Sequence, residues 1–210
     1  MSSTLKKILG VLFSAFILSV AYYGSYLPLN KSEAFISALR SMQSIKSLAD
    51  FEQTFSAPLN MPSPIGQEEL VRNTTNIVLN LVQQSNNPDV VEKAIDFIES
   101  YYNPIINRGR GMSFEQNLYI LGAVNESAFV KTKQARFLGD SEKYYSKGLE
   151  LGPKRPQFLY GLYDIYRIEG NVDGVKAIAA QILSQWPEDE RVSASFAEFL
   201  QRAEEFKAQR

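Results

Sequence analysis

Apolar side chains recur along this chain at helical spacing. Near the C-terminus, for example, they are Val192, Phe196, Phe199 and Leu200. Positions three and four residues apart share one face of an α-helix, so a segment with this spacing has one apolar face to bury. The pattern predicts an all-α fold.

Proline, glycine and asparagine separate the predicted helices. Turns are predicted at Ser85–Pro88, Asn103–Pro104 and Gly170–Asn171, and three prolines interrupt regular structure between Ala57 and Gly66. Asp140 has the side chain of a helix N-cap. We predict helices over 31–40, 47–55, 67–84, 89–102, 113 to about 136, 140–152, 158–170, 172–185 and 188–207.

The first 29 residues differ from the rest because they contain a long stretch without charged side chains. Ile8–Leu29 contains 22 residues without a charge, which is long enough to cross a bilayer. Lys6 and Lys7 precede this stretch and favour a cytoplasmic N-terminus, and tyrosines at 22, 23 and 26 suit the far interface. We therefore expect a single-pass cell-membrane protein whose remaining chain is extracytoplasmic.

Two other interpretations of this segment stay open. Ser19–Ala21 resembles the small-residue cleavage site of a secretory signal peptide, and a buried helix of a soluble protein is the third alternative. All three interpretations leave the chain from Asn30 onward as the functional part. We divide the chain into an anchor or signal peptide at 1–29, short helices with a proline-rich connector at 30–65, and a helical-repeat domain at 66–210.

Pro153 and Pro187 each follow a predicted helix and lie 34 residues apart. A 34-residue period with helix, tight turn and helix between the prolines resembles the tetratricopeptide (TPR) repeat. Numbered from Pro156, Leu162 and Tyr166 fall at the large apolar and aromatic positions of that repeat. The resemblance implies an α-solenoid of TPR-like helical hairpins.

The repeat departs from the family pattern at two positions. Tyr163 stands where a small residue is usual, and Val175 stands where alanine is usual. These larger side chains suggest a loosened contact between the helices. In the preceding repeat, Gly148 occupies a position where close packing needs a small side chain.

Composition excludes much of ordinary catalysis. The chain has no cysteine and no histidine, and so it lacks thiol nucleophiles, thiolate metal ligands and the commonest general base. We expect no catalytic residue, no metal and no cofactor, and therefore no enzyme. The net charge of -1 gives no reason to expect nucleic acid. A protein partner is the expectation that remains.

A wider resemblance covers nearly the whole chain. The membrane span, Pro62–Gly66, Tyr101–Gly111 and the terminal repeat resemble the C-terminal portion of bacterial O-antigen ligase-like membrane proteins, in which a TPR region follows a many-span catalytic part. The resemblance implies a scaffold accessory to surface-polysaccharide assembly, with a glycan or lipid-linked glycan as a further partner. The alternative is a C-terminal fragment or subunit of such a glycosyltransferase.

The resemblance also indicates a binding surface. The inner wall of a TPR solenoid is built from first helices, which here implies Gln157, Tyr160, Asp164 and Arg167. Positions 160, 164 and 167 share one helix face. We expect a partner to contact these residues, and the alternative is that Asp164 and Arg167 merely pair with each other.

Two basic clusters are weaker candidates. Arg108 and Arg110 could present guanidinium groups to a phosphate or sugar acid, although an ordinary solvated loop is the favoured interpretation. Lys131, Lys133 and Arg136 are similar: they form either a patch for anionic lipid or glycan, or a solvated helix end.

Overall fold

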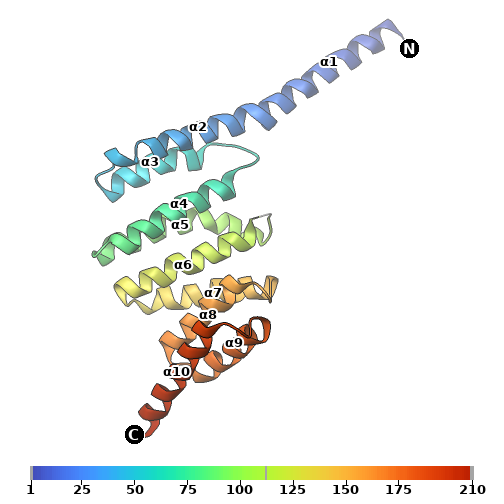
Figure 1. Ribbon diagram of the computed structural model, residues 1–210. Helices are drawn as coiled ribbons and strands as arrows, with labels where there is room; N and C mark the ends of the chain where they lie inside the picture. Colours follow the sequence, from blue (N-terminus) through green and yellow to red (C-terminus); the bar gives the residue numbers. More distant parts are fainter. Residues whose placement is uncertain (1, 112, 209–210) are drawn as a thin grey trace. The chain divides into compact units, whose positions relative to one another are not determined.

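The computed structural model describes residues 2–111 and 113–208, and within these ranges it contains helices and no strand (Figure 1). This confirms the predicted all-α fold class. The elements are α1 (Ser3–Ala21), η1 (Tyr22–Tyr26), α2 (Leu27–Arg40), η2 (Met42–Ser44), α3 (Leu48–Asn60), α4 (Gln67–Gln84), α5 (Pro88–Arg108), α6 (Phe114–Thr132), α7 (Ala135–Leu151), α8 (Pro156–Glu169), α9 (Val172–Gln185) and α10 (Glu190–Ala208).

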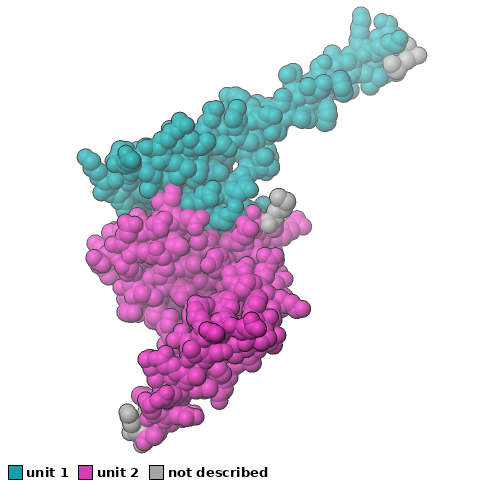
Figure 2. All heavy atoms as spheres, in the orientation of Figure 1, with its two compact units in different colours: residues 1–74, 97–108 teal, residues 75–96, 109–210 magenta. Residues whose placement is uncertain are grey.

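The chain packs as two compact units, coloured separately in Figure 2. Unit 1 consists of residues 1–74 and 97–108, and unit 2 consists of residues 75–96 and 109–210. Helices α4 and α5 each contribute to both units.

The N-terminal element is one continuous helix, Ser3–Arg40, which is long and apolar enough to cross a membrane. The sequence predicted a separate helix from Lys31, and that was wrong. Pro28 does not end the helix because it follows the π-helical turn Tyr22–Tyr26, where the Leu27 N–H donates to the carbonyl oxygen of Tyr22. The wider turn makes room for a proline ring that would otherwise clash with the preceding turn.

Aromatic packing closes unit 1. Phe55 on α3 is fully buried, and its ring centroid lies 5.9 Å from that of Phe35 on α2. Phe51, one turn earlier, has its ring centroid 5.9 Å from that of Phe97 on α5 in an edge-on arrangement. Such pairs stabilise beyond the area they bury. Helix α3 continues past its predicted end at residue 55 because Leu59 is buried on the same face.

A buried lysine ties α2 to the start of α4 within unit 1. Lys31 is 3% exposed. Its Nζ donates to the carbonyl oxygen of Met61 at 2.8 Å and to the Gln67 side chain. An ammonium group is tolerated at this depth because these oxygens replace part of its hydration.

Helix α5 runs beyond the predicted stop at Asn103–Pro104 and ends at Arg108. Pro104 lies on the exposed face, where it removes one backbone hydrogen bond at a cost of about 3 kcal/mol. Burial of Ile105 on the same side as Tyr102 offsets that cost. The prediction failed because it considered the proline without the buried residue that follows it.

The boundary between α6 and α7 also differs from the prediction. Helix α6 ends at Thr132, where Lys133 adopts a left-handed conformation with φ of 58°. Helix α7 then begins at Ala135, so Asp140 lies inside it and does not cap it. The earlier start is explained by Phe137, which is buried in the first turn of α7.

Within unit 2, each helix from α6 to α10 packs against its neighbours in sequence, and α6 also contacts α8. The predicted turn at Gly170–Asn171 is confirmed. Gly170 ends α8 with φ of 69°, and the Asn171 side chain accepts a hydrogen bond from the Gly174 N–H at 3.0 Å, capping α9.

A tyrosine ring is held between two glycines at the centre of unit 2. A Cβ at Gly122 on α6 would lie 2.3 Å from the Tyr145 ring, and a Cβ at Gly161 on α8 would lie 2.5 Å from its other edge. One helix further on, Gly148 of α7 receives the Phe158 ring in the same way. Three successive helices are therefore joined by aromatic rings that fill the space left by missing side chains.

The contact between α8 and α9 is not loosened, contrary to the sequence prediction. Tyr163 and Val175 are both buried. The close approach lies one position before Val175, at Gly174, whose Cβ would come within 2.8 Å of the Tyr166 ring.

We predict that Gly122→Ala destabilises the full-length protein in detergent. Glycine to alanine in an open helical position normally stabilises by about 0.5–1 kcal/mol, but overpacking against Tyr145 costs about 1–3 kcal/mol. The control is Gly139→Ala in α7, where a Cβ meets nothing within 4 Å. Thermal unfolding followed by circular dichroism should show a lower Tm for Gly122→Ala and a slightly higher Tm for Gly139→Ala. An equal rise in both would contradict the packing described.

Candidate functional site

Unit 2 carries an open groove of about 460 Å³. Helix α6 forms its length with residues on one face, namely Tyr119, Ala123, Glu126, Ser127, Val130 and Lys131. Leu79 and Gln83 of α4 and Tyr145 of α7 complete the lining. The lining combines apolar surface with one carboxylate, one ammonium group and two tyrosines.

Glu126 and Tyr145 form the polar centre of the groove. The Tyr145 hydroxyl donates to Oε2 of Glu126 at 2.9 Å. The ring of Tyr145 is 2% exposed, so the packing against Gly122 and Gly161 fixes where its hydroxyl lies. The backbone positions of α6 and α8 thus determine the direction in which the Glu126 carboxylate is held.

The surroundings of Glu126 disfavour the charged form of its carboxylate. Burial raises the pKa of Glu126 above its ordinary value, the hydrogen bond from Tyr145 lowers it, and the nearby Asp164 carboxylate raises it again. The same burial, together with the Glu126 charge, raises the pKa of Tyr145. No cation forms an ion pair with Glu126 among residues 2–111 and 113–208.

One predicted site residue acts on this centre, and a second is paired with it. Asp164 on α8 contributes to the field at Glu126 and Tyr145. Arg167 forms an ion pair with Asp164 at 3.4 Å, and its guanidinium lies 5.4 Å from the Tyr163 ring centroid. The alternative that Asp164 and Arg167 pair with each other is therefore seen in the structure.

Tyr160 has its polar atom engaged within the chain. Its hydroxyl donates to Oδ2 of Asp189, whose Oδ1 accepts from the Val192 N–H at 2.9 Å near the start of α10. The Tyr160 ring stacks on Trp186 and lies under the Arg191 guanidinium. Its contacts hold α10, although it remains partly exposed together with Gln157.

Arg108 belongs to unit 1 and Arg110 to unit 2. Arg108, at the end of α5, forms an ion pair with Glu68 of α4 at 2.9 Å within unit 1. Arg110 is exposed in the loop that follows. Arg108 is thus partly neutralised by its own chain, and its role as a phosphate or sugar-acid contact stays a prediction.

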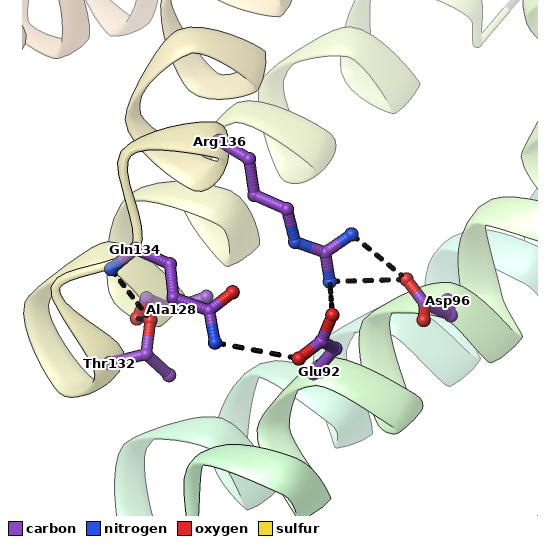
Figure 3. A network of polar contacts seen from close by, with 6 residues as sticks. All are labelled: Glu92, Asp96, Ala128, Thr132, Gln134 and Arg136. Carbon is purple, nitrogen blue, oxygen red and sulfur yellow. Dashed lines mark hydrogen bonds and ion pairs between the residues drawn. The ribbon is translucent and has the colours of Figure 1, made fainter.

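The basic cluster of Lys131, Lys133 and Arg136 does not act as one patch, because acidic side chains pair with Arg136. Figure 3 shows Arg136 of α7 between Glu92 and Asp96 of α5, with nitrogen–oxygen distances of 3.1 and 3.3 Å. Gln134 donates to the other oxygen of Glu92. Arg136 therefore joins α5 to α7, which leaves Lys131 as the member of this cluster that faces the groove.

Sequence reasoning missed the pair at the centre of the groove. Glu126 and Tyr145 lie 19 positions apart on different helices, so no local spacing connects them. The available signal was glycine inside helices, at Gly122 and Gly161, which indicates a close approach by another group. Which group approaches depends on the tertiary packing.

Comparison of the chain with protein-family models, curated proteins and solved structures finds no match. The site is therefore interpreted from its own geometry.

We predict that Glu126→Gln stabilises the protein at neutral pH. Because the folded-state pKa of Glu126 is raised, the folded chain favours the protonated form, and stability is lost as pH rises from the ordinary value of 4.5 through the raised pKa. A glutamine removes the charge and can still accept the Tyr145 hydrogen bond.

The measurement is Tm against pH for the full-length protein. Glu126→Gln should raise the Tm at pH 7 by roughly 2–4 °C, the effect of about 1 kcal/mol in a chain of this size, and the gain should vanish below pH 4.5. Glu150→Gln, an exposed residue paired with Lys147, is the matched control and should change little. A lower Tm for Glu126→Gln at pH 7 would contradict the account.

Proposed function

We propose that this protein is a membrane-anchored scaffold that binds a partner protein in the groove of unit 2, with its helical domain outside the cytoplasm. The observation that carries the proposal is the groove, which has a volume of about 460 Å³ and is lined by apolar and aromatic side chains. It also contains the Glu126 carboxylate, whose charged form is disfavoured by burial. Concave surfaces with few polar groups amid apolar lining are the usual form of binding sites.

The proposal includes a TPR-like solenoid. Three observations support it: the 34-residue spacing of Pro153 and Pro187, the packing of each helix from α6 to α10 on its neighbours in sequence, and the glycines that receive an aromatic ring from the next helix. Repeat proteins built in this way bind partners on extended surfaces and need no catalytic group. In such a solenoid, α6 and α8 are each the first helix of a repeat. Helix α6 carries the groove residues, and α8 carries the predicted contacts.

The anchoring proposal rests on the helix Ser3–Arg40, which is exposed along its apolar part. The two lysines before it favour an N-terminus in the cytoplasm. Tyr22 and Tyr26, with ring centroids 5.5 Å apart, suit the opposite interface. We place the scaffold in surface-polysaccharide assembly on its resemblance to O-antigen ligase-like proteins, with a lipid-linked glycan as a further partner.

A single-cysteine cross-linking experiment tests both the orientation and the groove. The chain contains no cysteine, so Gln83→Cys introduces a unique thiol at the groove. Intact host cells are treated with a membrane-impermeant maleimide that carries a photoactivatable group, and then illuminated. We expect labelling in intact cells and a cross-linked band that contains a second protein.

Lys176→Cys on the exposed surface of α9 is the control, and it should be labelled equally without giving that band. Labelling of Gln83→Cys only after cell lysis would overturn the proposed orientation. Identical cross-linked products from both positions would overturn the groove as the binding surface.

A further inference from the structure

Among residues 2–111 and 113–208, no basic side chain forms an ion pair with the Glu126 carboxylate in the groove. The Glu126 carboxylate accepts a hydrogen bond from the neutral Tyr145 hydroxyl. The charged group that acts on its pKa is Asp164, which is also negative and is itself paired with Arg167. A half-buried carboxylate without a cation costs folding free energy, so this position favours any positive group that enters the groove.

Aromatic surface lines the same groove as this carboxylate. The Tyr119 ring is 40% exposed, and its centroid lies 6.3 Å from that of Tyr145. A planar guanidinium or an ammonium group is attracted to the face of such a ring. The alkyl stem of a lysine or arginine also matches the apolar lining at Leu79 and Val130.

We propose that the groove binds a basic side chain of the partner protein, with Glu126 as its counter-ion and Tyr119 as its aromatic wall. This inference rests on the proposed function and specifies the chemistry of the partner at that site. The Asp164 carboxylate adds negative potential at Glu126. Lys131, five residues after Glu126 on α6, lines the groove without forming an ion pair to that residue.

The position of Lys131 gives the site a direction. A helix rises 1.5 Å per residue, so Lys131 lies about 7.5 Å along α6 from Glu126. A partner segment with a basic residue at Glu126 and an acidic or carbonyl group toward Lys131 matches both charges. The opposite orientation places like charges together and is disfavoured.

The test uses N-acetyl-arginine amide as a probe and N-acetyl-citrulline amide as its uncharged isostere. Full-length protein in detergent is labelled with ¹³C at alanine methyl groups, and the Ala123 resonance reports the groove. We expect a saturable shift of Ala123 with the arginine probe at millimolar concentration, no shift with citrulline, and no shift of buried Ala179 on α9.

Glu126→Gln should weaken binding of the arginine probe at least fivefold, while the unchanged Ala179 resonance shows that the fold is retained. Equal shifts with arginine and citrulline, or unchanged affinity in Glu126→Gln, would overturn the proposal. Partner cross-linking at Gln83→Cys without probe binding would overturn the basic-residue assignment alone. Loss of both signals would overturn the proposed function as well.

Discussion

The packing of one tyrosine ring between two glycines is the constraint on which unit 2 depends. Tyr145 leaves α7 and fills the space that Gly122 on α6 and Gly161 on α8 leave open. The ring cannot rotate without opening both contacts, and well-packed interiors resist such openings. The same ring carries the hydroxyl that binds Glu126. The position of a polar group in the groove therefore follows from the packing of three helices, which is how binding sites gain a fixed geometry.

This arrangement keeps a charge where it lowers stability. Burial and the Asp164 carboxylate both oppose ionisation of Glu126, and an uncharged side chain there would stabilise the fold. Binding sites commonly carry such a cost, which the surrounding structure offsets. Here the offset comes from the buried aromatic residues of unit 2, among them Phe137, Tyr145 and Phe158. Under the proposed function, a partner that brings a positive charge recovers part of this cost, which favours the bound state.

Local features of the fold could be predicted from sequence, and features that depend on distant residues could not. Helix α4 and the Gly170–Asn171 turn follow from periodicity and cap chemistry, which act within a few residues. The end of α5 and the start of α7 did not follow, because the burial of Ile105 and Phe137 overrides the local signals at Pro104 and Asp140. For the site, helical geometry placed Asp164 and Arg167 on one face, but the pairing of Glu126 with Tyr145 arises only when α6 and α7 pack together.

The ionisation of Glu126 tests the central claim most directly. Carbon-13 at the side-chain carboxyl of glutamate gives a titration curve for each residue of the full-length protein, and the Glu126 signal is identified by its loss in Glu126→Gln. The account predicts a pKa for Glu126 clearly above 4.5, the ordinary value, and a further rise when Tyr145→Phe removes the hydrogen bond that favours the charged form. A pKa at or below the ordinary value would mean that a cation already neutralises this carboxylate, which would contradict the account.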